Sequence, residues 1–140
     1  MESDEGDRIR LTVPATAAAA RITRVSAAGL ATRAGFSYGE VEQLRLAVDE
    51  ASALLAGHVG ERAANGTDAA RLVVVYVVER AGLEVELRVE GMPGPGPDEL
   101  EVPDLARMVL DHSVDGWEVA PAERRVTLHK RRAHHEDEDE

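Results

Sequence analysis

The segment that decides the fold reads Leu44-Arg45-Leu46-Ala47-Val48-Asp49-Glu50-Ala51-Ser52-Ala53-Leu54-Leu55-Ala56-Gly57-His58. Apolar residues recur in it and just before it at spacings of three and four, at Val41, Leu44, Val48, Ala51 and Leu55. This spacing predicts a helix with one buried stripe. A second row at similar spacing consists of Ala47, Glu50, Leu54 and His58. The Glu50 carboxylate in this row is expected either to be solvated at a rim or to face a pocket.

The composition indicates one domain of ordinary size. The chain has 140 residues and no cysteine, which excludes disulfides, thiolate metal sites and cysteine nucleophiles. No apolar run approaches the ~18–20 residues that a membrane span needs, and the acidic start has no signal-peptide pattern. We therefore expect a cytoplasmic protein that does not bind membranes.

Most of the negative charge lies at the two ends of the chain. The formal net charge is −11, but residues 2–7 hold four acids and residues 136–140 hold five, with no base among them. Without those acids the body carries only about −2. We expect disordered acidic ends at residues 1–7 and 133–140 around one domain at residues 8–132. This distribution argues against non-specific nucleic-acid binding.

Capping residues and alternating apolar residues divide the chain into elements. Thr16 can cap a helix that Gly35 ends. Ser37 and Glu40 form a capping box for the next helix, which is expected to fray at residues 57–60. Alternating or β-branched apolar residues predict strands at residues 9–13, 72–78, 83–89, 117–119 and 125–130.

The remaining segments complete the order of elements. Residues 91–97 read Gly-Met-Pro-Gly-Pro-Gly-Pro and are expected to form a loop, because prolines lack the N–H donors of a helix or interior strand. Residues 103–112 are expected to form a third helix with Pro103 in its first turn. The order strand, helix, helix, strand, strand, loop, helix, strand, strand predicts an α+β two-layer sandwich. Its mostly antiparallel sheet would be covered on one face by helices.

This order, together with Leu46-Ala47-Val48-Asp49-Glu50-Ala51 on the second helix, resembles the anti-sigma-factor serine-protein kinases of bacteria. The resemblance covers residues 8–132 and implies the fold of the histidine-kinase, gyrase, Hsp90 and MutL ATPase domains. It implies that Glu50 stands at the position of the catalytic general base. The family has a magnesium-holding asparagine four residues later, where this chain has Leu54, which carries no ligand atom.

The nucleotide-binding turn implied by the resemblance is also altered. In the family it reads Asp-x-Gly-x-Gly, and the aspartate accepts a hydrogen bond from the adenine amino group. Matched without a gap, Gly91 takes the aspartate position and prolines replace both glycines. Shifted by one residue, Gly94 and Gly96 match, but a methionine replaces the aspartate, and Glu90 can substitute only in a rebuilt turn. The family's second glycine motif is absent from residues 103–108.

These positions are expected to line a degenerate nucleotide pocket, formed by Glu50, Leu54, His58, Glu90, Gly91, Gly94 and Gly96. A leucine in place of the amide removes a metal ligand and puts an alkyl group where triphosphate charge must lie. Prolines remove backbone N–H groups that would cradle phosphate. We therefore expect weak or absent binding of Mg-ATP and no metal site. ATP and magnesium would be the cofactors only if the chain is an active kinase.

A second local match concerns protein partners. Arg24-Val25-Ser26 stands where the family uses an arginine to grip the sigma factor and the antagonist, so Arg21, Arg24 and Val25 are candidate partner-binding residues.

Each position also has a plain structural interpretation. Glu50 can be a rim or capping carboxylate, and Leu54 can fill the former ligand site with core. His58 can be a helix-end residue favoured by the C-terminal dipole. Arg24 can be an ordinary solvated arginine, and residues 91–97 a rigid connector.

Three functional hypotheses follow. The first is a non-enzymatic anti-sigma factor, a homodimer that sequesters an alternative sigma factor of RNA polymerase and is released by an anti-anti-sigma antagonist. The second is an active kinase that phosphorylates a serine of that antagonist. The third is an unrelated α+β protein-binding module, which would lack a pocket between helix and sheet.

Overall fold

The strands of the structure are β1 (Asp7–Pro14), β2 (Arg71–Val78), β3 (Gly82–Glu90), β4 (Gly116–Ala120) and β5 (Arg125–Arg131). The structure is a computed structural model that describes residues 7–63 and 70–133. Within these residues the strands form one sheet in the order β1-β2-β3-β5-β4, and each neighbouring pair is antiparallel.

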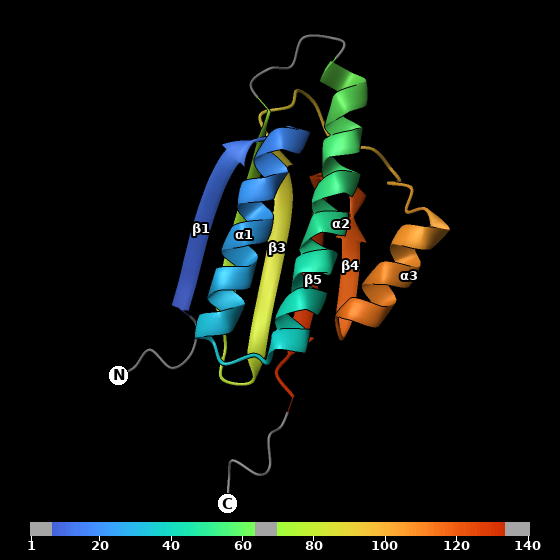
Figure 1. Cartoon of the computed structure of the whole chain (residues 1–140). Helices are drawn as coiled ribbons and strands as arrows, with labels where there is room; N and C mark the ends of the chain where they lie inside the picture. Colours follow the sequence, from blue (N-terminus) through green and yellow to red (C-terminus); the bar gives the residue numbers. More distant parts are fainter. Residues whose placement is uncertain (1–6, 64–69, 134–140) are drawn as a thin grey trace, which may run out of the picture.

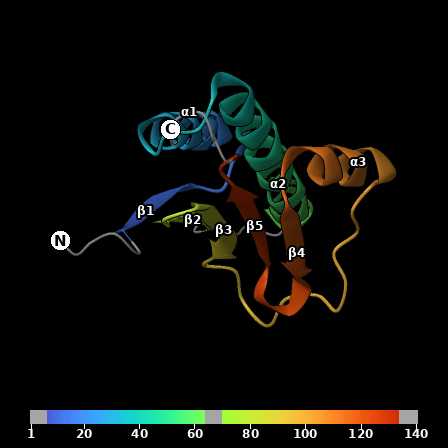
Figure 2. The same ribbon diagram turned by 90° about the horizontal axis from the view of Figure 1, so that it is seen from below.

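The helices are α1 (Ala17–Arg33), α2 (Tyr38–Ala63) and α3 (Asp104–Ser113), and a short 3-10 helix, η1 (Pro121–Glu123), joins β4 to β5. Figure 1 shows α1 and α2 side by side in front of the sheet, and Figure 2 shows all three helices on the same face. The predicted α+β two-layer sandwich and the order of its elements are therefore confirmed. No helix among the described residues is long and apolar enough to cross a lipid bilayer.

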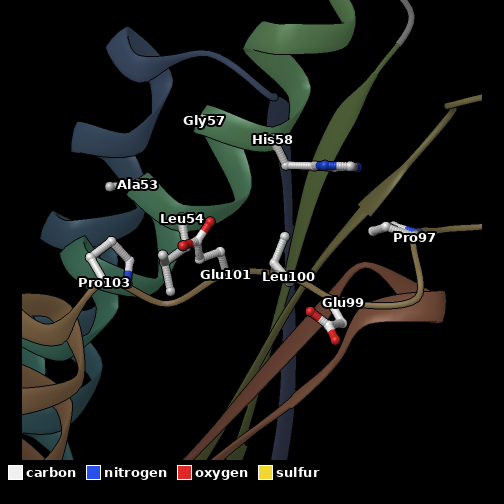
Figure 3. Close-up of a pocket in the computed structure, with 9 residues that line it drawn as sticks. All are labelled: Ala53, Leu54, Gly57, His58, Pro97, Glu99, Leu100, Glu101 and Pro103. Atoms are coloured by element: carbon white, nitrogen blue, oxygen red, sulfur yellow. The ribbon is translucent and has the colours of Figure 1, made fainter.

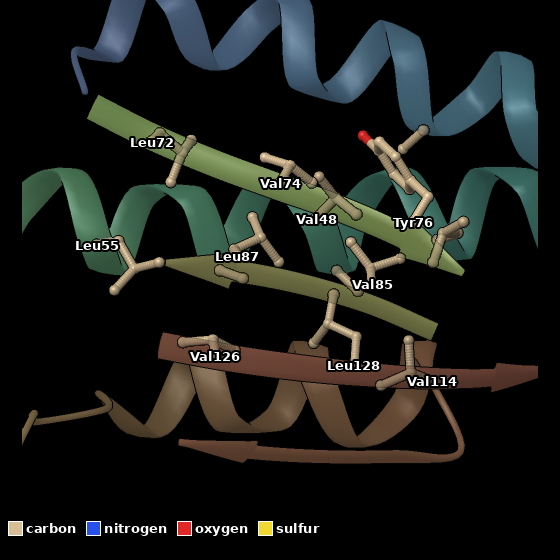
Figure 4. Close-up of a cluster of buried hydrophobic side chains, with 14 of the residues drawn as sticks. Val48, Leu55, Leu72, Val74, Tyr76, Val85, Leu87, Val114, Val126 and Leu128 are labelled. Atoms are coloured by element: carbon tan, nitrogen blue, oxygen red, sulfur yellow. The ribbon is translucent and has the colours of Figure 1, made fainter. Parts of the chain in front are cut away.

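The predicted stripe of α2 is buried in the core. The exposed fraction is 7% for Val41 and 0% for Leu44, Val48, Ala51 and Leu55. Figure 4 shows Val48 and Leu55 of α2 in one cluster with apolar side chains of the central strands. Burial of each such side chain stabilises the fold by about 1.5–3 kcal/mol, so this stripe fixes α2 on the sheet.

The capping predictions are confirmed. The Thr16 side chain accepts a hydrogen bond from the Ala19 amide, and Gly35 follows α1 with a φ of 92°. The Ser37 amide donates to Glu40 Oε1 at 2.7 Å, and the Glu40 amide donates to Ser37 Oγ at 3.2 Å. These local bonds define where α1 ends and α2 begins.

The expected fraying of α2 at residues 57–60 is wrong. The helix continues through Gly57 and ends at Ala63. Val59 is only 4% exposed and extends the buried stripe one turn beyond Leu55. Burying this side chain outweighs the cost of about 0.5–1 kcal/mol for a glycine inside a helix.

Candidate functional site

A cavity of about 730 Å³ lies between α2 and the segment that leads into α3. Its lining residues, shown in Figure 3, are Ala53, Leu54, Gly57, His58, Pro97, Glu99, Leu100, Glu101 and Pro103. The structure thus brings together Leu54 and His58, which the sequence analysis placed in one pocket. The third hypothesis predicted that no pocket lies between a helix and the sheet. This cavity is lined by α2 and the segment before α3, so that prediction stays open.

The chemistry of this lining is apolar and acidic. Leu54 and Leu100 contribute alkyl groups from two elements, and Glu99 and Glu101 contribute exposed carboxylates. The nine lining residues include no lysine or arginine. The lining therefore offers no lysine or arginine to neutralise a bound phosphate.

Glu50 lies on α2 one turn before Leu54, outside the lining of this cavity. Its side chain is half-buried, and within the part of the chain that the structure describes no hydrogen bond or ion pair reaches its carboxylate. This placement fits either a rim carboxylate or a base, so its catalytic role stays a prediction.

The Gly/Pro loop, residues 91–97, is held by a buried arginine. Arg124 follows η1, is 8% exposed and has a φ of 48°, a left-handed conformation that is rare for a residue other than glycine. Its guanidinium donates to the carbonyls of Pro93 at 3.4 Å, Gly94 at 3.3 Å and Pro95 at 3.0 Å. This contact could not be predicted from the sequence, because nothing near Arg124 points to a loop about 30 residues earlier.

The loop glycines have structural reasons to be glycine. Gly91 and Gly94 have φ angles of 89° and 74°. A Cβ on Gly96 would lie 2.4 Å from the Pro121 carbonyl oxygen and 2.5 Å from that of Ala122. None of the three glycines lines the cavity. The close approach of the loop to η1 therefore explains why residue 96 is a glycine, without any role in nucleotide binding.

Glu90 is not brought into the cavity. The preceding residue, Val89, is 5% exposed and belongs to the core, so the side chain of Glu90 lies on the opposite face of the sheet. There its carboxylate pairs with Arg88 at 2.8 Å and lies 3.9 Å from Arg10. The substitution of Glu90 for the family aspartate, which the sequence allowed only in a rebuilt turn, therefore has no geometric support.

An exposed patch crosses the outer surfaces of α1 and α2. At its centre Arg24 and Asp49 form an ion pair of 2.9 Å between the two helices. Around it Ile22, Val25 and Leu46 are 53%, 64% and 56% exposed. We call these residues, with Arg21, the helical patch. Arg21, Arg24 and Val25 were predicted from the sequence as partner-binding residues. Ile22 and Leu46 were not, because apolar residues on the surface and in the core look alike in a sequence.

Two buried polar side chains tie this helical layer together. Lys130 Nζ donates to Gln43 Oε1 and to the Ser113 carbonyl, each at 2.8 Å, so it links β5 with α2 and α3. Burial lowers the pKa of Lys130, against the opposing charges of Asp115 and Glu40.

The Tyr76 hydroxyl joins β2 to α1. It donates to the Thr23 carbonyl at 3.1 Å and lies 2.7 Å from Ser26 Oγ. This contact anchors the helix that carries most of the helical patch.

The residues present do not fit a magnesium nucleotide. Leu54 offers no metal ligand, and the cavity lining carries the two carboxylates of Glu99 and Glu101, which would repel phosphate charge. Within residues 7–63 and 70–133, no three His, Asp or Glu side chains are grouped closely enough to hold a metal ion.

No family model matches the chain. The chain is 36% identical over 85 residues to the serine-protein kinase RsbW of Listeria monocytogenes serotype 4a (strain HCC23), an alignment covering 61% of this chain and 52% of that relative. It is 28% identical over 86 residues to RsbW of Bacillus cereus (strain AH187), covering 61% of this chain and 51% of that relative. The chain thus spans about half the length of the curated relatives it matches. These relatives confirm the resemblance of the chain to the anti-sigma-factor serine-protein kinase family.

Proposed function

We propose that this chain is an anti-sigma regulatory factor that acts without efficient nucleotide binding. It sequesters an alternative sigma factor of RNA polymerase in the cytoplasm and is released when an anti-anti-sigma antagonist competes for an overlapping surface. The observation that carries the proposal is the cavity beside α2. It has Leu54 where the family places a magnesium ligand, and Glu99 and Glu101 in its lining.

The electrostatics of the cavity support this conclusion. A nucleoside triphosphate carries several negative charges, which need metal ions or basic side chains once they leave water. Here Glu99 and Glu101 add like charge, and Leu54 removes the metal ligand. The negative charge of the site and its lack of a metal ligand would therefore both disfavour binding of Mg-ATP.

The helical patch supports a protein partner. Exposed apolar side chains that surround a charged pair are typical of interaction surfaces. Ile22, Val25 and Leu46 provide the apolar area, and Arg24 provides an arginine of the kind enriched at binding hot spots. The proposal includes that the chain forms a homodimer. Sedimentation equilibrium measures the molecular mass in solution and so tests this directly.

An active kinase is the second candidate. The relatives are named serine-protein kinases, and Glu50 stands at the position of the family's general base. In that case the chain would bind Mg-ATP and transfer phosphate to a serine of its antagonist, and Glu50→Ala would abolish the transfer.

Calorimetry with ATP and ADP, with and without magnesium, separates the two candidates. We expect no binding up to millimolar nucleotide. Micromolar, magnesium-dependent binding would overturn the proposal and favour the kinase.

Partner binding is tested with the sigma factors of the cognate organism. We expect one of them to form a complex that Val25→Asp and Arg24→Ala weaken, while Arg33→Ala, an exposed arginine in the last turn of α1, leaves it unchanged. If no sigma factor binds, the anti-sigma proposal is wrong whatever the calorimetry shows.

A further inference from the structure

Four acidic side chains lie in and beside the segment that borders the cavity. They are Asp98, Glu99, Glu101 and Asp104. No hydrogen bond or ion pair reaches any of these carboxylates from the residues that the structure describes. Elsewhere in the domain, by contrast, Asp49 and Glu86 form ion pairs with arginines at 2.9 and 2.8 Å. Among the described residues, the negative charge that borders the cavity is thus not paired within ion-pair distance.

The segment that carries these carboxylates is held in place by contacts at both of its ends. Upstream, Arg124 binds the carbonyls of residues 93–95, and the Gly96 amide donates to the Ala122 carbonyl at 3.1 Å. Downstream, the Pro103 carbonyl accepts a hydrogen bond from the backbone amide of Arg107, in the first turn of α3, at 3.0 Å. Between these anchors Leu100 packs against the core. These contacts within the protein therefore hold Glu99 and Glu101, the two neighbours of Leu100, at the cavity.

We propose that this cavity receives a basic side chain, arginine or lysine, from a protein partner. Leu54 and Leu100 offer apolar surface for the aliphatic stem, and Glu99 and Glu101 offer carboxylates for the charged end. Figure 3 shows these groups contributed by two elements, α2 and the segment leading to α3. The inference rests on the proposed partner-binding function and adds the chemistry of one contact, at a place distinct from the helical patch.

A partner's side chain fits this cavity better than a free amine. The two carboxylates are exposed, and an ion pair between exposed groups contributes only about 0–1 kcal/mol. A free amine must also offset its own loss of translational freedom, whereas a side chain on a partner docked elsewhere arrives at high effective concentration. Electrostatic complementarity then adds specificity to a complex that already exists.

The test uses a model of the arginine side chain, the n-butylguanidinium ion, and its uncharged analogue n-butylurea. Binding is followed by the methyl NMR signals of Leu54 and Leu100. We expect n-butylguanidinium to shift these signals, with a weak but saturable curve, and n-butylurea to leave them nearly unchanged. The double variant Glu99→Gln/Glu101→Gln should bind n-butylguanidinium about fivefold more weakly, while Glu118→Gln, an exposed carboxylate on β4, should not change binding.

Three results would overturn the inference. Equal shifts with n-butylurea would show that charge plays no part. Unchanged binding by the double variant would place the cation elsewhere. If putrescine binds at least tenfold more tightly than n-butylguanidinium, the occupant is a free diamine and not a side chain of a partner. Because the probe does not require a sigma factor, failure of the anti-sigma proposal is detected separately.

Discussion

Replacing Tyr76 with phenylalanine should change how stability depends on alkaline pH. The side chain is fully buried, and its hydroxyl contacts the Thr23 carbonyl and Ser26 Oγ. Burial raises the pKa of Tyr76 from 10.0 to about 12, although the Ser26 hydrogen bond opposes the shift. The folded protein therefore holds this proton over a pH range in which the unfolded chain releases it.

The sign and size of the effect follow from this difference. The stabilisation is fully present below pH 10 and is lost as the pH rises toward 12, because only the unfolded chain ionises in that range. A difference of about two pKa units corresponds to about 2.7 kcal/mol, of which about half is lost by about pH 11. At neutral pH, Tyr76→Phe should cost only about 1 kcal/mol for the lost hydrogen bond.

Urea unfolding measured by circular dichroism between about pH 8 and about pH 11 tests this reasoning. The free energy of unfolding should fall with pH more steeply in the wild type than in Tyr76→Phe, so the two curves should converge and cross before about pH 11. Tyr38→Phe is the matched control, because Tyr38 is 82% exposed and should leave the pH dependence as in the wild type. Parallel curves for the wild type and Tyr76→Phe would refute the argument.

Four further outcomes concern the loop and the cavity. Gly96→Ala should lower the free energy of unfolding by more than about 2 kcal/mol, because its Cβ would meet two carbonyl oxygens; thermal or urea unfolding measures this. Gly57→Ala, with open space around its Cβ inside α2, should instead stabilise the fold by about 0.5–1 kcal/mol in the same assay. Arg124→Met should speed amide hydrogen exchange in residues 91–97 and lower stability by about 2–3 kcal/mol, while Arg125→Met should not change exchange in this loop. Leu54→Asn alone should not produce ATP binding in calorimetry, since the acidic lining remains; micromolar binding by this variant would show that the leucine was the main obstacle.

Local patterns carried most of the fold prediction. The spacing of Leu44, Val48 and Leu55 specified the buried face of α2, and the Ser37–Glu40 capping box specified its start. Both signals act between residues within a few positions of each other, so a sequence shows them directly. The resemblance then placed Leu54 and His58 at one pocket, and the structure brings both into the cavity.

Contacts between distant segments were not predictable in the same way. Arg124 binds a loop about 30 positions earlier, and no periodicity marks such a pair. Glu90 was matched to a family position by alignment of a turn, whereas strand alternation directs its side chain to the other face of the sheet. The end of α2 depended on the burial of Val59, which follows from tertiary packing and overrides the nearby glycines.

Lys130 is the sole lysine of the chain, and it is 7% exposed. An amine-reactive reagent added to the folded domain therefore finds no accessible ε-amino group there. Modification of Lys130 requires the junction of α2, α3 and β5 to open and release the bonds to Gln43 and Ser113. The rate at which this one amine is acylated thus reports how often the junction opens, without any engineered label.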